Sequence, residues 1–230
     1  MSRYALGEAG HVASHNIRVK IHLMTKHEKL AVLKKEMEMA KLPLKGKANL
    51  VFGEGNPDCS VLFIGEAPGF TEDMQKRPFV GRSGQLLDKL IVGINWQRKD
   101  VYITNIVKRR PPENRDPSPE EIEAYRPYLA RQIEILNPKI IATLGRFSMN
   151  YFLPLAKISN DHGKVHQVEG RIVFPLFHPA AAMRATHVME DLQADFKKLP
   201  AVIAGKSPSS APGIAQIAKK IEKPAQTKLF

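Results

Sequence analysis

Residues 60–84 read SVLFIGEAPGFTEDMQKRPFVGRSG, and this stretch decides the fold. The apolar run at 61–64 is ended by Gly65, which is typical of a short strand that is buried on both faces. A loop rich in proline and glycine follows, and Ser83 is placed to cap a helix whose leucines recur on one side. A buried strand followed by a loop and an amphipathic helix indicates an α/β protein with a parallel sheet.

The alternation of strands and helices continues on both sides of this stretch. We expect further strands at 101–104, 139–144 and 172–177, and helices at 26–41, 146–153 and 186–199. Ser118 and Glu121 have the spacing of a capping box, which predicts the start of a long helix that ends near Leu136. This order predicts a three-layer α/β/α fold around a central four-stranded parallel sheet.

Three loops follow predicted strands, at 65–84, 105–116 and 178–184. Ligands of open parallel sheets bind beyond the carboxyl ends of the strands. Because these ends lie on one edge of the sheet, we expect the three loops to meet there and to form a site.

The length and composition suit one globular domain with terminal segments. The chain has 230 residues, of which 43% are hydrophobic and 25% are charged, which is enough for a substantial core. We assign residues 26–200 to the domain, 1–25 to an N-terminal extension and 201–230 to a flexible basic tail. No apolar run reaches the roughly 18–20 residues of a membrane helix, and we expect no signal peptide.

The charge balance of the chain is strongly basic. Thirty-five lysines and arginines stand against 23 aspartates and glutamates, for a formal net charge of +12. Such an excess suits a polyanion such as nucleic acid, because each phosphate contact releases counterions. A protein that is basic without binding a polyanion is the alternative, and charge alone leaves both open.

Four segments carry a resemblance to a known family. The loop from Gly65 to Gly84, with P-F-V-G-R at 78–82, is very similar to the first motif of family 4 uracil-DNA glycosylases, the iron–sulfur branch. The similarity continues with V-Y-I-T-N at 101–105, P-P-E-N-R-D-P at 111–117 and H-P-A-A-A at 178–182. It implies a monofunctional hydrolase of base excision repair that flips uracil out of DNA and hydrolyses the N-glycosidic bond, leaving an abasic site.

The resemblance also assigns residues that hold the flipped base. It implies that Phe79 stacks on uracil, and that Asn105, whose amide carries a donor and an acceptor, matches O4 and N3–H. His178 would donate a hydrogen bond to O2 and stabilise the leaving anion. Outside these motifs, a core phenylalanine, a turn asparagine and a structural histidine would be the ordinary interpretations. The matching pocket positions are Gly65, Ala67, Gly69, Glu72 and Asn114.

The group that activates water is less clearly marked. Related families place an aspartate one residue after Glu66, where this chain has Ala67. We therefore take Glu66 as the candidate base. The alternative is that catalysis rests on stabilisation of the leaving anion, with help from the charge of the DNA itself.

Several residues near the predicted pocket are candidates for DNA contact. Ser83 and Gly84 open a helix whose free N–H groups suit a phosphate. Met183 and Arg184 are placed to wedge into the gap left by a flipped base. A solvated basic loop is the ordinary alternative for the run that follows Asn105. The DNA-binding set comprises Arg82, Ser83, Gly84, Lys108, Arg109, Arg110, Arg115, Met183 and Arg184.

The chain departs from the family at the cysteines that hold its cluster. The resemblance places these four cysteines at positions that are Met39, Leu42, Arg109 and Tyr125 in this chain, and Cys59 is its one cysteine. A single thiolate cannot hold zinc or an iron–sulfur cluster. We therefore predict no cofactor and no metal.

The last residues resemble the Q-x-x-L-F peptides that bind sliding clamps, through Gln226, Leu229 and Phe230. A chain end without a partner is the alternative. We expect a monomer in the cytoplasm, associated with the nucleoid, whose partner is uracil-containing DNA, single- or double-stranded. Two other functions stay open: a non-catalytic reader of uracil-DNA or replication accessory protein, and a glycosylase for a broader range of deaminated bases.

Overall fold

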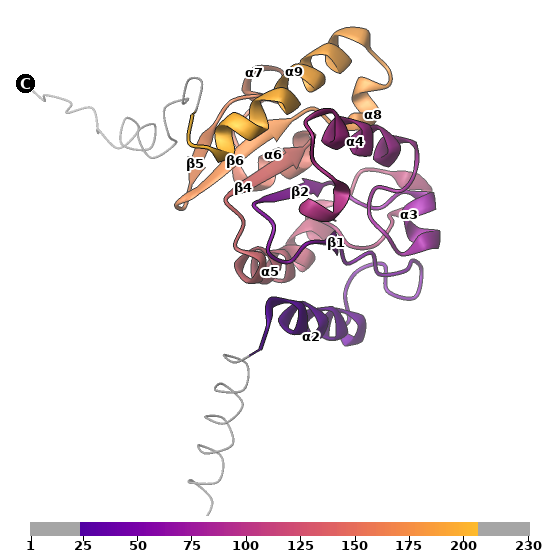
Figure 1. Cartoon of the computed structure of the whole chain (residues 1–230). Coiled ribbons are helices and arrows are strands. Elements are labelled where there is room, and N and C mark those ends of the chain that lie inside the picture. The colour runs from indigo at the N-terminus through magenta and orange to yellow at the C-terminus, as the bar shows by residue number, and fades with distance from the viewer. Residues whose placement is uncertain (1–23, 207–230) are drawn as a thin grey trace, which may run out of the picture.

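A six-stranded mixed sheet forms the centre of the molecule. The computed structural model describes residues 24–206 (Figure 1). The strand order is β1-β3-β2-β4-β6-β5, in which the four inner strands run parallel and the two edge strands pair antiparallel. The strands are β1 (Glu54–Gly55), β2 (Val61–Gly65), β3 (Tyr102–Asn105), β4 (Ile140–Leu144), β5 (His166–Val168) and β6 (Arg171–Leu176).

The helices cover both faces of the sheet, so the predicted three-layer α/β/α fold is confirmed. On one side lie α4, α8 and α9, and on the other lie α5 and α6, with α2 packed against α5 (Figure 1). The helices are α2 (Lys26–Met39), α3 (Phe70–Gln75), α4 (Arg82–Gly93), α5 (Pro119–Leu136), α6 (Arg146–Phe152), α7 (Ile158–Asp161), α8 (Pro179–Ala182) and α9 (Thr186–Ile203), with 3-10 turns at Arg98–Asp100 and Pro112–Asn114.

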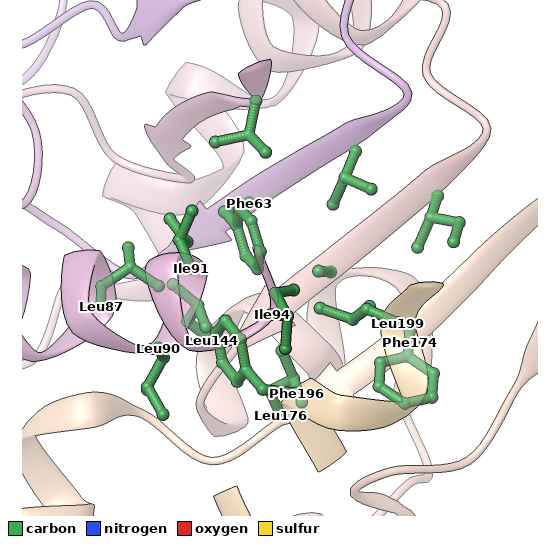
Figure 2. Close-up of a cluster of buried hydrophobic side chains, with 14 of the residues drawn as sticks. Phe63, Leu87, Leu90, Ile91, Ile94, Leu144, Phe174, Leu176, Phe196 and Leu199 are labelled. Carbon is green, nitrogen blue, oxygen red and sulfur yellow. The ribbon is translucent and has the colours of Figure 1, made fainter. Parts of the chain in front are cut away.

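Alternation along β2 explains why the sheet is buried on both sides. Val61 and Phe63 enter the cluster beneath α4 and α9, whereas Leu62 and Ile64 enter the cluster beneath α5 and α2. Figure 2 shows Phe63 within the first cluster, and its ring stacks on that of Phe196 with the centroids 5.6 Å apart. All five residues of β2 are buried, as the uninterrupted apolar run predicted.

Two edge strands were not predicted from the sequence. Strand β1 has two residues, and β5 has three, so neither leaves a recognisable apolar pattern. Strand β5 joins β6 through a two-residue turn in which Glu169 and Gly170 have φ of 48° and 76°. Positive φ at both central residues is typical of tight hairpin turns. The predicted four-stranded parallel sheet is therefore the centre of a larger mixed sheet.

The predicted helix starts were right for α5 and wrong for α4. The Ser118 hydroxyl accepts from Glu121 N, and the Glu121 carboxylate accepts from Ser118 N at 2.8 Å, which completes the capping box. Helix α4 begins after Gly81, so Ser83 lies within its first turn and caps nothing. The reason is that Gly81 N donates to the Glu72 carboxylate at 2.7 Å, which turns the chain two residues earlier.

The ends of the domain differ slightly from the expected boundaries. Helix α9 continues to Ile203, past the expected end at 199, and includes Pro200. The clamp-binding residues proposed from the sequence, Gln226, Leu229 and Phe230, lie outside the described residues, as do most of the N-terminal extension and the tail. Among the helices at 24–206, none is long and apolar enough to cross a membrane.

Candidate active site

The three loops predicted to meet do line one cavity, of about 310 Å³, at the carboxyl ends of the parallel strands. Its volume lies at the small end of the roughly 300–1,000 Å³ that is typical of ligand pockets. Most of the predicted pocket residues line it, together with Ala180, which sequence analysis did not single out. The lining from the first loop is Glu66, Ala67, Gly69, Glu72, Phe79 and Ser83, and from the later loops Asn105, Asn114, His178 and Arg184.

Phe79 is held in the cavity wall in a conformation that a non-glycine residue rarely adopts. Its φ is 50°, and its side chain is buried. Arg98 fixes this loop, because its guanidinium donates to Phe79 O at 3.1 Å and to Pro78 O at 2.5 Å. Arg98 is itself held by Glu54 at 2.8 Å and by Asp88 at 2.7 Å.

Sequence analysis missed Arg98 as a residue that builds the site. It lies 19 residues after Phe79, on a 3-10 turn beyond α4. An arginine in a polar stretch carries no local signal that it will reach back to the carbonyls of an earlier loop. Only the packing of α4 under that loop brings the two together.

Gly65 makes room for two side chains that face the cavity. A Cβ atom at this position would lie 2.5 Å from both the Phe79 ring and the Asn105 carboxamide oxygen. Real Cβ atoms do not approach other atoms so closely. A glycine is therefore required here by close approach and not by its backbone angles.

Asn105 ends β3 beside Gly65, with which it is paired in the sheet register. Its side chain is 1% exposed, and its Oδ1 has no hydrogen-bond partner among the described residues. A buried amide oxygen without a partner costs about 1–3 kcal/mol, so such atoms usually meet a donor from elsewhere. Since Asn105 lines the cavity, that donor is expected from a ligand.

His178 presents a fixed N–H to the same cavity. It is the N-cap of α8, and its Nδ1 accepts from Ala180 N at 3.1 Å, which leaves the proton of the neutral ring on Nε2. Burial lowers the pKa of His178 to about 4, against a smaller opposing effect of Glu72. The imidazole is therefore a neutral donor at pH 7. Its ring centroid lies 5.7 Å from that of Phe79.

Glu66 is a carboxyl whose environment disfavours its charge. Burial raises the pKa of Glu66 to about 7, and the nearby Asp116 adds to the rise while Arg146 opposes it. A carboxylate with a pKa near neutral accepts a proton much more readily than an ordinary glutamate. The raised pKa is compatible with a general base, and this role for Glu66, proposed from the sequence, stays a prediction.

Glu72 has a structural role that the sequence did not reveal. Its side chain is 8% exposed, and Oε1 accepts from Val80 N at 3.0 Å and Gly81 N at 2.7 Å. These are the two residues that follow Phe79. Glu72 therefore fixes the backbone of the loop that contains Phe79. Its hydrogen bonds also link α3 to the start of α4.

Two basic residues of the predicted DNA-binding set do not face solvent, and the prediction for them is wrong. Lys108 is fully buried, with Nζ 2.5 Å from Thr104 Oγ1 and 2.6 Å from Gln132 Oε1. Burial lowers the pKa of Lys108 well below its usual value. Arg109 is 6% exposed and donates to Ala48 O at 2.7 Å. Both side chains turn inward between β3, α5 and the segment before β1.

The remaining members of that set differ in how accessible they are to DNA. Gly84 is buried beneath the backbone of Phe79 and offers no surface to a phosphate, so the prediction for it is also wrong. Arg115 is engaged in a two-pronged ion pair with Glu121 at 2.7 and 2.9 Å. Arg110 Nε donates to Asn114 Oδ1 at 2.7 Å. Arg82, Met183 and Arg184 are exposed.

The positions that correspond to the cluster cysteines do not suit a metal cluster. Tyr125 is fully buried and donates to Pro43 O at 2.8 Å, and Arg109 reaches the same segment at Ala48. Cys59 is buried, and burial raises the pKa of its thiol to about 11, which disfavours the thiolate that a cluster needs. Within residues 24–206, no three His, Cys, Asp or Glu side chains are placed to hold a metal.

Comparison with known proteins agrees with this site. The sequence profile of the uracil DNA glycosylase superfamily matches residues 52–201, which include every loop of the cavity. A type-4 uracil-DNA glycosylase of Archaeoglobus fulgidus is 42% identical over 174 residues, covering 72% of this chain and 87% of the relative. That of Sulfurisphaera tokodaii is 46% identical over 165 residues, covering 66% and 74%. The chain therefore belongs to the uracil DNA glycosylase superfamily, in which it is similar to the type-4 enzymes.

Proposed function

We propose that this protein is a monofunctional uracil-DNA glycosylase, which hydrolyses the bond between uracil and deoxyribose and leaves an abasic site. The observation that carries the proposal is the Oδ1 of Asn105, buried without a hydrogen-bond partner among the described residues in the wall of a cavity of about 310 Å³. The similarity to type-4 uracil-DNA glycosylases supports it independently.

Asn105 distinguishes uracil from cytosine by the polarity of its amide. Oδ1 accepts from uracil N3–H, and Nδ2 donates to uracil O4. Cytosine presents an acceptor at N3 and a donor at C4, so both contacts would become repulsive. Because Asn105 is buried, no water can replace the lost hydrogen bonds, and a buried polar site of this kind rejects the wrong partner strongly.

The leaving group is stabilised by His178. When the bond between C1′ and N1 breaks, its electron pair leaves on uracil and spreads onto O2 and O4. The Nε2–H of the neutral His178 imidazole donates a hydrogen bond to O2. The proton stays on His178 and is not transferred to the uracil. Such a fixed donor in a site shielded from water contributes more than the same bond in solution.

Glu66 supplies the base for the attacking water. The oxygen of the water bonds to C1′ of the sugar cation, and its proton passes to the Glu66 carboxylate. A pKa near 7 makes this transfer favourable at neutral pH while keeping about half of the enzyme in the active form. A carboxyl with a raised pKa in this cavity supports the enzyme over a reader of uracil-DNA that does not cleave it.

The reaction proposed here uses side chains alone. The substrate is uracil-containing DNA, whose phosphates meet the exposed Arg82 and Arg184 at the rim of the cavity. We propose that no iron–sulfur cluster takes part, because none of the residues at the four cluster positions carries a thiol: Arg109 and Tyr125 donate to backbone carbonyls, Leu42 packs on apolar side chains, and Met39 is exposed. A monomer in the cytoplasm, delivered to DNA by a clamp-binding tail, stays the expectation from the sequence.

Cleavage of a single-stranded oligonucleotide that holds one uracil, followed by hot alkali, tests the proposal. The wild type is expected to give strand scission, and His178→Ala and Asn105→Ala are each expected to lose at least about 100-fold in rate. His187→Ala, at an exposed histidine of α9, serves as the matched control and should keep full activity. An intact oligonucleotide that the wild type still binds would make the protein a reader. Equal scission of a hypoxanthine oligonucleotide would extend its range of bases.

A further inference from the structure

A second cavity, of about 410 Å³, adjoins the one that holds the base. The two share part of their lining, including Glu72, Ser83 and Arg184, so the second cavity continues the first toward the surface. What the second cavity adds is Phe70 at the start of α3 and Met183 after α8. A strand of DNA that leaves the first cavity would enter the second.

Phe70 is unusually exposed for an aromatic residue beside an active site. Its side chain is 60% exposed, whereas most of the large apolar residues of the domain are buried. The guanidinium of Arg110 lies over the ring, 5.1 Å from its centroid. Arg110 also donates to Asn114, which lines the first cavity, so the Phe70 ring is held in a defined place relative to that cavity.

The charges around Phe70 suit a sugar–phosphate backbone. Arg82 and Arg184 line the second cavity, and the Arg110 guanidinium lies over the Phe70 ring, which stays 60% exposed. None of these three arginines forms an ion pair with a carboxylate at residues 24–206. An aromatic ring with unpaired arginines beside it is the usual arrangement for stacking nucleobases of a single strand.

We propose that Phe70 is the platform of a second base subsite, which stacks one unpaired nucleobase next to the flipped uracil. This inference rests on the proposed function, because it takes DNA with uracil in the first cavity as the ligand. In a duplex the neighbouring base is still paired with its complement and stacked on its other neighbour, so moving it onto Phe70 would break those contacts. In single-stranded DNA the base is free to stack on Phe70, and the subsite therefore favours single-stranded substrates.

The test compares kcat/KM for a single-stranded and a double-stranded oligonucleotide of the same sequence. Phe70→Ala is expected to reduce kcat/KM on the single strand by roughly 5- to 100-fold, the range for loss of one base–aromatic stack, and much less on the duplex. Phe70→Trp keeps a ring face and should retain the preference. Met74→Ala is the matched control, because Met74 is a 63% exposed residue of the same helix and lines neither cavity.

Single-stranded oligonucleotides that lack one base identify which nucleotide near the uracil stacks on Phe70. Each nucleotide near the uracil is replaced in turn by an abasic tetrahydrofuran residue. For the wild type, kcat/KM should fall at one position, and Phe70→Ala should show no further fall there, since the stack is already absent. Equal losses in both proteins at every position, or an unchanged single-strand rate for Phe70→Ala, would overturn the subsite while leaving the glycosylase function intact.

The Phe70 subsite can also be tested by binding if the wild type does not cleave the oligonucleotide. The same oligonucleotides are then titrated against wild type and Phe70→Ala by fluorescence anisotropy. A Kd that rises roughly 5- to 100-fold for Phe70→Ala, and that no longer responds to the missing base, supports the subsite in a binding protein. Equal Kd values for both proteins would overturn the Phe70 subsite, independently of whether the protein is a glycosylase.

Discussion

At the residue scale, two ionisable groups of the cavity are shifted in opposite directions by the same cause. Burial disfavours a charge, so it raises the pKa of the Glu66 carboxyl to about 7 and lowers that of the His178 imidazole to about 4. At neutral pH the pair therefore consists of a carboxyl ready to accept a proton and an imidazole that only donates a hydrogen bond. Such separation of two pKa values is what assigns different roles to neighbouring groups.

The pH dependence of kcat/KM follows from these shifts. Because only the ionised carboxylate of Glu66 can take the proton of water, kcat/KM is expected to rise with pH, to be half-maximal near pH 7 and to level off about one pH unit above that. His178 stays neutral down to about pH 4, so it adds no inflection near its ordinary pKa of 6.5. Initial rates on a single-stranded uracil oligonucleotide, measured from pH 5 to pH 9, check this.

Glu66→Gln provides the control for that profile. The amide cannot accept the proton, so the variant should lose about 100-fold or more in kcat/KM and should show no rise through neutral pH. A profile of the same shape in the variant would assign the rise to another group and leave anion stabilisation as the main source of catalysis.

At the scale of the elements, the position of Phe79 depends on contacts between segments far apart in the chain. Glu72, in α3, holds the amides that follow Phe79, and Arg98, beyond α4, holds the carbonyls of Pro78 and Phe79. The left-handed backbone of Phe79 is unfavourable for a residue with a side chain, so it requires such external support.

Removal of Arg98 is expected to damage both stability and activity. Arg98→Ala deletes two hydrogen bonds from a charged donor to loop carbonyls, so the free energy of unfolding should fall by on the order of 3 kcal/mol. The shift of Phe79 that follows should lower kcat/KM by about 10- to 100-fold. Urea unfolding and uracil excision below the unfolding transition measure the two effects.

Arg77 offers the matched control for Arg98. It also pairs with Glu54, at 2.7 Å, but no hydrogen bond joins it to Pro78 O or Phe79 O. Arg77→Ala should therefore leave kcat/KM within about two-fold of wild type, and its largely exposed ion pair is worth little in stability. Equal losses of kcat/KM in the two variants would mean that Arg98 acts through its ion pair with Glu54 and not through its hydrogen bonds to the Phe79 loop.

At the scale of the whole molecule, the segment before β1 is held to the domain by side chains where the family has a cluster. Tyr125 and Arg109 donate to the carbonyls of Pro43 and Ala48, and Leu42 packs on the core beneath α5. A cluster stabilises a fold by tying distant segments to one centre. Here hydrogen bonds and apolar contacts tie the same segment to the domain.

Chelation is therefore expected to leave the protein unchanged. The purified protein should be colourless, and prolonged incubation with a chelator should alter neither the melting temperature nor the rate of uracil excision, since four thiolates are needed and the chain has one cysteine. Metal analysis, thermal unfolding and the oligonucleotide assay check this together. Visible absorption by a bound cluster, or a melting temperature lowered by the chelator, would contradict it.

The sequence by itself determined the central sheet, the start of α5 and the family of the chain. An uninterrupted apolar run indicates a doubly buried strand wherever it occurs, and the capping box at Ser118 is a contact between residues three apart. The motifs also identified Phe79, Asn105 and His178, which line one cavity. These features depend on local pattern, which a sequence displays directly.

Only the tertiary structure decided which charges face water and which groups support the site. Lys108 and Arg110 are two residues apart in one basic run, yet the first is buried and the second lies over Phe70 at the rim. The role of Arg98 and the shifted pKa of Glu66 likewise arise from chain segments that meet only after folding. Burial and long-range hydrogen bonds depend on what surrounds a residue in space, and the identity of its neighbours in sequence does not specify this.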